Sequence, residues 1–291
     1  MKGLILSGGK GTRLRPLTYT SAKQLGPGAN KPVLFYGLEA MAAAGIREVG
    51  IIIGETGDEI RAAVGDGSQF GLEVTFIPQD APLGLAHAVL TAEAFIGDSP
   101  FCMYLGDNLL RDGVAGFVDS FRAGDADAMI LLQHVPNPSE YGVAELHDDG
   151  TVRRLVEKPK EPQSDLALVG VYLFTQGVIV AARALEPSWR GELEITDAIQ
   201  GMVDAGLRVE PHVVTGWWKD TGQLADMLEA NRLILDQLET DVQGEVIDSK
   251  LEGRVVIQAG ATVERCHVRG PVVICSGATV RDAYIGPYSA I

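Results

Sequence analysis

A glycine-rich stretch with three cations follows the first apolar run of the chain, and this combination of residues can bind phosphate. Residues 8–16 read Gly-Gly-Lys-Gly-Thr-Arg-Leu-Arg-Pro and come directly after the apolar run 4–6. Glycine lets backbone N–H groups approach phosphate oxygens, and Lys and Arg neutralise the phosphate charge. The first acidic residue is Glu39, although the 291-residue chain has a formal net charge of −15. Positive charge concentrated at one end of an acidic protein predicts a highly anionic small-molecule ligand.

Neither common phosphate-binding template fits this stretch. The P-loop pattern requires Gly-Lys-Ser/Thr after four spacer residues, and the dinucleotide pattern that begins at Gly9 has Leu14 where its third glycine belongs. The stretch therefore predicts neither an ordinary ATPase loop nor a nicotinamide-binding turn. A tight connection between a strand and a helix is the structural alternative, and it stays open at this point.

Two aspartates in separate motifs could hold a divalent cation. Asp107 follows an apolar run in the sequence Tyr-Leu-Gly-Asp-Asn, and Asp220 lies in Trp-Trp-Lys-Asp-Thr-Gly, just before a long helical pattern at 222–238. Mg²⁺ prefers one or two carboxylates together with phosphate oxygens. A helix N-cap or a turn is the structural alternative for Asp107. The acidic pair before Gly150 is typical of a hairpin turn and is not a candidate ligand.

Short Val/Ile/Leu-rich runs alternate with helical patterns over the first two hundred residues. The expected strands are 3–7, 48–53, 73–77, 101–105 and 127–133, and the expected helices are 35–45, 57–64, 84–95 and 114–122. Strands without polar alternation belong to a sheet that is covered on both faces, so the pattern predicts a doubly wound α/β core with a Rossmann-like sheet. Ligands bind such a sheet beyond the carboxyl ends of its strands, which is where residues 8–15, Gln79 and Asp107 fall.

A repeat of 17 residues occupies the C-terminal part, where 255–263 recurs as 272–280. The aliphatic positions are spaced by six, six and five residues: Leu251, Ile257, Val263, Val268, Ile274, Val280, Ile285 and Ile291. Three short faces per coil predict a triangular parallel β-helix of the hexapeptide type, with a left-handed coil, whereas a pair of similar hairpins would show turn dipeptides and period-two alternation. We expect a catalytic domain at 1–241 and a β-helix domain at 242–291. Because Ile291 falls partway through a coil, we expect further coils or a covering subunit, and a homo-oligomer, either dimer or tetramer.

The composition excludes several classes of protein. With 46% apolar residues the chain can build an ordinary core, and no apolar run approaches the ~20 residues of a membrane span. The hydrophobic start is too short for a signal peptide, so we expect a cytoplasmic protein without a membrane partner. An acidic chain argues against nucleic acid as a partner, because phosphate backbones are bound by broad basic surfaces. Cys102, Cys266 and Cys275 lack the spacing of a disulfide framework or a thiolate metal site.

Together with the segments that follow it, the glycine-rich loop resembles the nucleotide-binding loop of the sugar-phosphate nucleotidyltransferases. These segments are Ser-Ala-Lys-Gln-Leu at 21–25 and Asn-Lys-Pro at 30–32, and Lys-Gln-Leu is most similar to the glucose-1-phosphate thymidylyltransferases. The resemblance covers about residues 1–240. It implies a Mg²⁺-dependent transfer of dTMP from dTTP to glucose 1-phosphate, which gives dTDP-glucose and pyrophosphate. A UTP- or GTP-using sugar-1-phosphate nucleotidyltransferase and a non-catalytic regulatory subunit that binds sugar nucleotides are the alternatives.

The resemblance also implies roles for single residues at the triphosphate. Arg13 would stabilise the leaving pyrophosphate, assisted by Lys10 and Arg15, and Lys23 would bridge the reacting phosphates. Asp107 and Asp220 would hold the Mg²⁺. The implied nucleotide-binding residues are Gly8, Gly9, Gly11, Thr12, Arg13, Gln24, Gln79, Gly84 and Asp107. Among these, Gln79 can donate and accept at once and so match the imide edge of thymine or uracil, while Gly84 permits close approach to the base.

Four motifs in the middle of the chain resemble the sugar-binding half of the same family. They are Glu-Tyr-Gly-Val at 140–143, Val-Glu-Lys-Pro at 156–159, Leu-Val-Gly-Val-Tyr at 168–172 and Gly-Glu-Leu-Glu-Ile-Thr-Asp at 191–197. By this resemblance Glu157 accepts hydrogen bonds from sugar hydroxyls, Lys158 pairs with the sugar phosphate, and the pocket is lined by Tyr141, Gly142 and Gly170. His87 lies in an expected helix, and helix surface or packing is a commoner role there than general base. Gly-Pro-Gly-Ala at 26–29 departs from the family and predicts a looser loop.

Overall fold

The computed structural model describes residues 1–9, 11–19 and 21–291, so Lys10 and Thr20 lie outside the described residues. The chain forms two compact units. The first contains residues 1–25 and 34–220, and the second contains residues 26–33 and 221–291. Each unit has its own core, and each is described by itself below.

A mixed nine-stranded sheet forms the centre of the first unit, with the strand order β10-β9-β11-β6-β1-β4-β5 and with β8 linking β11 to β12. Its strands are β1 (Lys2–Ser7), β4 (Glu48–Ile53), β5 (Glu73–Pro78), β6 (Phe101–Leu105), β8 (Ala128–His134), β9 (Gly142–Leu146), β10 (Val152–Glu157), β11 (Leu166–Phe174) and β12 (Val209–Val213). The strands β6, β1, β4 and β5 run parallel, whereas β11 is antiparallel to β6. Parallel strands put their carboxyl ends at one edge, where the candidate residues follow β1, β5 and β6.

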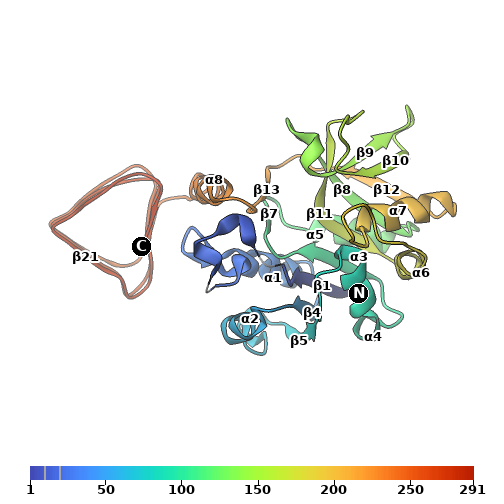
Figure 1. The fold of residues 1–291 in the computed structure, drawn as a ribbon. Helices are drawn as coiled ribbons and strands as arrows, with labels where there is room; N and C mark the ends of the chain where they lie inside the picture. Colours follow the sequence, from blue (N-terminus) through green and yellow to red (C-terminus); the bar gives the residue numbers. More distant parts are fainter. Residues whose placement is uncertain (10, 20) are drawn as a thin grey trace. The chain divides into compact units, whose positions relative to one another are not determined.

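Helices cover both faces of this sheet (Figure 1). The helices of the first unit are α1 (Val33–Ala43), α2 (Gly57–Val64), α3 (Leu85–Thr91), α4 (Glu93–Ile96), α5 (Ala115–Ala123), α6 (Gly177–Arg183) and α7 (Ile195–Asp204), with short 3₁₀ helices η1 (Thr12–Leu14), η2 (Leu17–Tyr19), η3 (Lys23–Leu25), η4 (Ser68–Phe70) and η5 (Pro138–Glu140). Along β1, Leu4 and Leu6 pack on the side of α3, α6 and α7, while Ile5 packs on the side of α1, α2 and α5. This two-sided burial explains why the strands lack polar alternation.

The expected α/β elements are confirmed in place and type, with one difference of detail. The helix expected at 84–95 is two helices, because α3 ends at Thr91 and α4 begins at Glu93. The Thr91 hydroxyl donates to the carbonyl of His87, 2.9 Å away. A threonine that bonds back to the carbonyl four residues earlier bends a helix and weakens its continuation.

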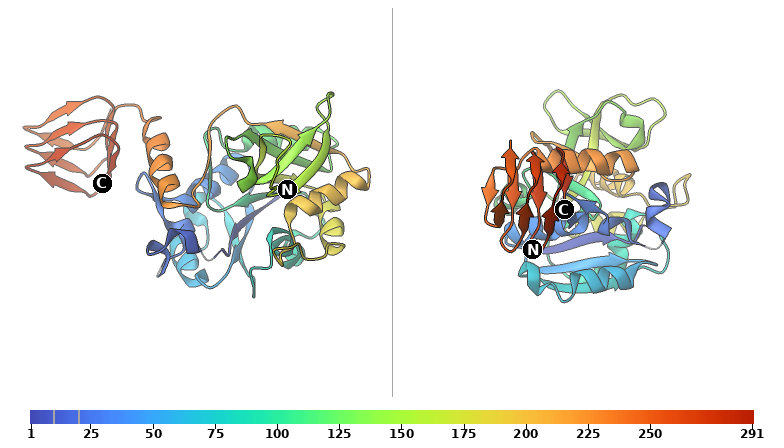
Figure 2. Two further views of the ribbon diagram at one scale, coloured as in Figure 1. Left: turned by 45° about the horizontal axis from the view of Figure 1, so that its top comes forward. Right: turned by 90° about the vertical axis from the view of Figure 1, so that its left-hand side faces the viewer.

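A parallel β-helix forms most of the second unit, and Figure 1 shows its triangular section. Its three sheets contain β14 (Asp241–Val242), β17 (Val255–Ile257), β20 (Val272–Ile274) and β23 (Ser289–Ala290); β15 (Glu245–Ile247), β18 (Thr262–Glu264) and β21 (Thr279–Arg281); and β16 (Lys250–Glu252), β19 (His267–Arg269) and β22 (Tyr284–Ile285). Val263 pairs with Val280 in the 17-residue register, and Ile257, Val263 and Ile274 are buried inside the coils. The strands stack in parallel (Figure 2), so the alternative of two hairpins is excluded.

The segment expected to be a loose loop is an antiparallel hairpin, so that prediction is wrong. β2 (Pro27–Gly28) pairs with β3 (Lys31–Pro32), and the two turn residues between them both have positive φ. The backbone N–H of Ala29 donates to the Asn231 side chain on α8 (Leu224–Leu235), 2.9 Å away. Ala29 also packs with Leu235 and with Val273 of the β-helix. The hairpin therefore belongs to the second unit, although it follows Lys23 closely in sequence. Among the described residues, no helix is long and apolar enough to cross a bilayer.

Candidate functional site

A cavity of about 360 Å³ lies in the first unit at the carboxyl ends of the strands, as the sheet topology predicts. Its lining includes Gly8 and Gly9 after β1, Gln79 after β5 and Asp107 after β6. The predicted site residues among its lining are Gly8, Gly9, Arg13, Lys23, Gln24, Gln79, Gly84, Asp107, Glu157, Lys158 and Asp220. Residues from the start, middle and end of the first unit thus meet in one cavity, and this convergence is the main observation on the site.

The glycine-rich loop packs closely around the Lys23 side chain. A Cβ at Gly9 would lie 3.2 Å from Cε of Lys23, and a Cβ at Gly11, whose φ is +60°, would lie 2.9 Å from Cβ of Lys23. Gly11 and Thr12 are outside the cavity lining, so Gly11 contributes to the conformation of the loop and does not line the cavity. Arg15 lies over the ring of Tyr19, with 5.1 Å between its guanidinium carbon and the ring centroid. Lys10, expected to assist Arg13, lies outside the described residues.

Lys23 forms an ion pair with Asp107 inside the cavity, where both side chains are largely buried. Burial works to lower the pKa of Lys23, but the carboxylates of Asp107 and Asp220 outweigh it, so this pKa is raised. Burial works in turn to raise the pKa of Asp107, but the charge of Lys23 outweighs it, so that pKa is lowered. Both groups are therefore held in their charged forms, and the cavity has a fixed cation beside a fixed anion.

The two candidate metal ligands are brought together by a short two-stranded sheet. β7 (Asn108–Leu110) begins directly after Asp107, and β13 (Trp218–Asp220) pairs with it so that Asp220 is opposite Asn108. Both carboxylates line the same cavity. Within the described part of the chain, no group of three or more His, Cys, Asp or Glu residues could hold a metal. Two carboxylates without a full protein cage fit Mg²⁺, which takes its other ligands from phosphate and water, better than they fit a structural metal.

The part of the cavity expected to bind the base is held in place by two contacts. The Gln79 amide nitrogen lies 2.8 Å from Nδ1 of His87, so His87 orients Gln79. Gly84 has a φ of +110°, and a Cβ there would lie 2.3 Å from the carbonyl oxygen of Leu193. Gln24 is 1% exposed, and its Oε1 has no hydrogen-bond partner among the described residues. A buried acceptor that lines a cavity and lacks a protein partner can be satisfied by a ligand donor.

At the other end of the cavity, Glu157 is held by two neighbours. The Thr196 hydroxyl donates to its Oε2 over 2.7 Å, and Nη1 of Arg190 donates to its Oε1 over 3.2 Å. Lys158 follows on the chain and lines the cavity with Glu157. A carboxylate fixed beside two cations can accept from hydroxyls while the cations bind a phosphate, which is the chemistry that a sugar phosphate requires.

Three of the predicted sugar-pocket residues lie behind the cavity wall instead of in its lining. A Cβ at Gly142 would lie 2.7 Å from the Thr196 hydroxyl, and a Cβ at Gly170 would lie 2.8 Å from Cδ1 of Leu105. The carbonyl of Tyr141 accepts a hydrogen bond from the backbone N–H of Lys158 over 3.0 Å. These three residues support the lining residues, and a direct contact with sugar stays a prediction for each.

Sequence reasoning missed Arg190, which lies at the centre of the acidic end of the cavity. Besides Glu157, its guanidinium donates to Glu194 over 3.3 Å and to Glu192 over 3.1 Å. The pKa of Glu194 is raised, chiefly because the side chain is buried and also because the charge of Glu157 lies nearby. The hydrogen bond from Ser188 and the charge of Arg190 act in the opposite direction and lower this pKa. The only hint in the sequence that Arg190 belongs to the site is its position just before the segment 192–197, which contains three acidic residues.

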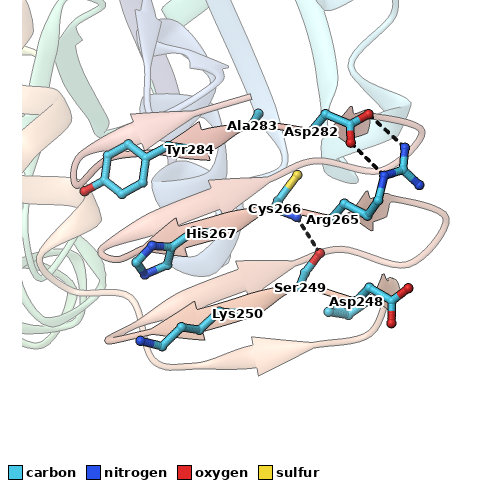
Figure 3. A pocket seen from close by; sticks show the side chains of 10 residues that line it. Asp248, Ser249, Lys250, Arg265, Cys266, His267, Asp282, Ala283 and Tyr284 are labelled. Atoms are coloured by element: carbon cyan, nitrogen blue, oxygen red, sulfur yellow. Dashed lines mark hydrogen bonds and ion pairs between the residues drawn. The ribbon is translucent and has the colours of Figure 1, made fainter.

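A second hollow, of about 800 Å³, lies on the outside of the β-helix (Figure 3). Its charged groups pair with one another: Arg265 donates from two nitrogens to the Asp282 carboxylate, over 2.6 and 2.8 Å. The Cys266 backbone N–H donates to the Ser249 hydroxyl over 2.9 Å. Because these polar groups satisfy each other along the coil register, the hollow is a feature of the β-helix surface and a weaker candidate than the cavity of the first unit.

Comparison with known proteins agrees with this geometry. Residues 2–237 match the nucleotidyl transferase family. A glucose-1-phosphate thymidylyltransferase of Streptomyces antibioticus is 56% identical over the whole of this chain and 82% of its own length. The low-salt glycan biosynthesis nucleotidyltransferase Agl11 of Haloferax volcanii is 51% identical over the whole chain and 83% of its own.

Two solved structures share the fold over about four-fifths of this chain. A Bacillus anthracis protein assigned as a glucose-1-phosphate thymidylyltransferase and solved with sucrose is 35% identical, with a TM-score of 0.76, over 80% of this chain and 94% of its own. A UDP-glucose pyrophosphorylase solved with UDP-glucose is 25% identical, with a TM-score of 0.72, over 81% of this chain and 98% of its own. With its glycine-rich loop, paired aspartates and acidic end converging on one cavity, this chain belongs to the nucleotidyl transferase family, among the sugar-phosphate nucleotidyltransferases that include the glucose-1-phosphate thymidylyltransferases.

Proposed function

We propose that the protein is a glucose-1-phosphate thymidylyltransferase, which transfers dTMP from dTTP to glucose 1-phosphate and releases pyrophosphate. The observation that carries the proposal is the single cavity that combines a glycine-rich loop, two carboxylates and a cationic, acid-rich end. Four cations, Arg13, Lys23, Lys158 and Arg190, line this cavity in a chain whose formal net charge is −15. Such a local concentration suits two phosphorylated substrates bound side by side. The names of the Streptomyces relatives support the choice of substrates.

The reaction that this cavity supports is an in-line displacement at the α-phosphorus of dTTP. An oxygen of the sugar 1-phosphate forms the new P–O bond, and the bond to the bridging oxygen of the β-phosphate breaks. The electron pair of that bond leaves with pyrophosphate, and no proton is required from the attacking oxygen. Catalysis of this kind is chiefly positioning and charge stabilisation.

Each substrate would be held by residues from its own side of the cavity. Gln79, Gly84 and Gln24 would bind the thymine nucleotide, and Glu157 with Lys158 would bind the sugar and its phosphate. Arg190 would act with Lys158 on the sugar phosphate, because both cations lie beside Glu157: the Arg190 guanidinium is 3.2 Å and the Lys158 ammonium 3.9 Å from its carboxylate. These placements bring the attacking oxygen to the triphosphate side of the same cavity.

The reacting phosphates would lie between Lys23 and the two aspartates. Lys23 would bridge the phosphate under attack and Arg13 would stabilise the departing pyrophosphate. Asp107 and Asp220 would hold Mg²⁺, which when bound neutralises charge on the phosphate oxygens. The pairing of Lys23 with Asp107 supports this arrangement, because it keeps the lysine charged and in place before the substrates arrive.

The test is a pyrophosphate-release assay with dTTP, glucose 1-phosphate and Mg²⁺, repeated with UTP and with GTP. The proposed function predicts turnover that is fastest with dTTP. Replacing Lys23 by Ala should cost about 3–4 kcal/mol in the transition state, or ~100–1000-fold in turnover, as for the loss of one oxyanion donor. Normal turnover by the Lys23→Ala variant would remove Lys23 from the mechanism. Calorimetric binding of dTTP without turnover would instead favour a regulatory subunit.

The assembly and location of the protein remain predictions of the sequence. We propose a cytoplasmic homo-oligomer, either dimer or tetramer, without a nucleic-acid or membrane partner. The acidic composition supports the absence of a nucleic-acid partner. Light scattering on the purified protein measures the oligomeric state, and a mass equal to the 31.0 kDa chain would contradict the expected oligomer.

A further inference from the structure

A continuous run of contacts leads from Trp218 to the carboxylate of Asp107. The indole Nε1–H of Trp218 donates to Oδ1 of Asn108 over 2.5 Å. The amide nitrogen of Asn108 donates in turn to Oδ1 of Asp107 over 3.1 Å, while Lys23 pairs with Oδ2 of the same carboxylate. Asn108 is 2% exposed and Asp107 is 8% exposed, so this run is inside the protein. It links an aromatic side chain to a predicted metal ligand through one amide.

The indole fixes which end of the Asn108 amide faces Asp107. A side-chain amide has an acceptor oxygen and a donor nitrogen, whereas an indole N–H can only donate. With the oxygen bound to Trp218, the nitrogen must point toward the carboxylate, where it donates. Without the indole, the amide could turn and present its oxygen to an anionic oxygen, which would repel it. The donor in Trp218 therefore helps to hold the Asn108 amide in the orientation in which its nitrogen donates to the Asp107 carboxylate.

The strand that carries Trp218 also carries the second carboxylate. In the pairing of β13 with β7, Trp218 is opposite Leu110 and Asp220 is opposite Asn108. The ring of Trp218 packs edge-on against Tyr141, with 5.3 Å between the ring centroids, and this contact helps to hold the indole. One strand thus positions Asp220 through its backbone and Asp107 through the side chain of Trp218.

We propose that Trp218 is a positioning residue for the metal site, acting through Asn108 on the Asp107 carboxylate. The proposal rests on the proposed function, since it assumes that Asp107 and Asp220 hold a divalent cation. Residues that orient metal ligands from behind typically change metal affinity or activity by 10–100-fold when they are replaced. We therefore expect Trp218→Phe, which keeps an aromatic ring but removes the N–H, to weaken metal binding within that range.

Trp217→Phe is the matched control. Trp217 precedes Trp218 and loses the same N–H in this variant, but its indole donates to no group among the described residues. Its backbone carbonyl accepts from the Arg111 N–H, and this hydrogen bond is unaffected by the substitution of the side chain. Thermal unfolding would establish that each variant is folded. Mn²⁺ alone, titrated into the protein and followed by the EPR signal of the free ion, would measure metal binding without turnover. The Mg²⁺ concentration for half-maximal pyrophosphate release would provide the second measurement.

The expected result is weaker Mn²⁺ binding and a higher Mg²⁺ requirement for Trp218→Phe, with the KM for glucose 1-phosphate little changed and with Trp217→Phe equal to the wild type. Adding Trp218→Phe to Asn108→Ala should then cause little further loss, because both act through one amide. Equal Mn²⁺ binding by Trp218→Phe and the wild type, or additive losses in the double variant, would overturn the inference. A wild type that binds no Mn²⁺ would overturn it too. A wild type that binds Mn²⁺ but releases no pyrophosphate would refute only the proposed function.

Discussion

The structure predicts in detail what replacing Gly84 by alanine would do to stability and to catalysis. With its φ of +110°, a Cβ at this position would lie 2.3 Å from the oxygen, 2.7 Å from the nitrogen and 2.9 Å from the carbon of the Leu193 backbone. Real Cβ contacts essentially never fall below 3.0 Å, so in Gly84→Ala the two segments must separate by at least 0.7 Å. Backbone atoms cannot rotate away as the end of a side chain can.

The energetic cost of Gly84→Ala has two sources. An alanine at this φ costs about 1–3 kcal/mol of strain. The separation also stretches two hydrogen bonds, from Leu193 N–H to the Leu83 carbonyl (2.8 Å) and from Ala86 N–H to the Leu193 carbonyl (3.0 Å). Each is worth about 1 kcal/mol. The expected loss of about 3–5 kcal/mol lies below or at the low end of the ~5–15 kcal/mol of unfolding free energy that folded domains have, so the variant should stay folded.

The kinetic cost should exceed what the lost stability alone would cause. Leu193 follows Arg190 by three residues in the turn that places its guanidinium, so the shift moves the proposed sugar end of the cavity as well as the proposed base end. A displacement near 1 Å can cost about 100-fold in rate. We therefore expect kcat/KM to fall about 100-fold for glucose 1-phosphate and for dTTP together, measured by pyrophosphate release at saturating partner substrate.

Gly97→Ala is the control for backbone strain alone. Gly97 also has a positive φ, of 58°, but a Cβ there would meet no atom within 4 Å. It should lose stability, seen in urea unfolding, while its kinetic constants stay those of the wild type. Wild-type kinetics in a folded Gly84→Ala variant would show that the contact with Leu193 does not position the site. An effect on the dTTP constants alone would refute the coupling of the two ends.

Two further predictions concern the aspartates. Asp107→Asn and Asp220→Asn should each remove Mg²⁺-stimulated pyrophosphate release while the protein remains folded, and full Mg²⁺ stimulation in either variant would exclude that residue as a ligand. Asp107→Asn should also lower the unfolding free energy by about 3 kcal/mol, because it leaves the charge of Lys23 mostly buried and without its partner. In the β-helix, the hydrogen bonds from Arg265 lower the pKa of Asp282. This pair should therefore stabilise the fold above the unfolded-state pKa of about 4 and lose that effect as the pH falls through the lower folded-state pKa. Asp282→Asn should reduce the unfolding temperature more at pH 7 than at pH 2. Asp248→Asn, at the equivalent position two coils earlier in the same column and also at positive φ, should change it little at either pH. Equal effects of the two substitutions would show that the ion pair contributes nothing.

The elements that could be predicted from the sequence are those in which burial follows a regular local pattern, either on every residue of a strand or at the same positions of each coil. The strands β1 and β4 are apolar on both sides because helices cover both faces of the sheet, and this is visible as an unbroken apolar run. The 17-residue repeat was equally visible, because each coil of the β-helix buries the same positions. Asp107 and Gln79 could be found because each directly follows such a strand.

The features that sequence reasoning missed depend on contacts between distant residues. Arg190 has meaning only once the fold brings Glu157 next to it, 33 residues away in sequence. The hairpin at 26–32 has few apolar residues, and it is ordered by Asn231 and Leu235, about 200 residues later. The position of Gly170 is likewise explained by Leu105 and not by its neighbours in the chain. No local pattern contains these partners.

The hairpin has a consequence for any exchange of parts between relatives. The chain passes from one unit to the other three times, after Leu25, after Val33 and after Asp220. The first passage follows Lys23 by two residues and the last directly follows a predicted metal ligand. A chimaera that replaces only the C-terminal β-helix would keep Ala29 of the hairpin and Leu235 of α8 but would lose the Val273 side chain against which both pack. The unit that can be grafted is therefore discontinuous, and residues 26–33 must travel with residues 221–291.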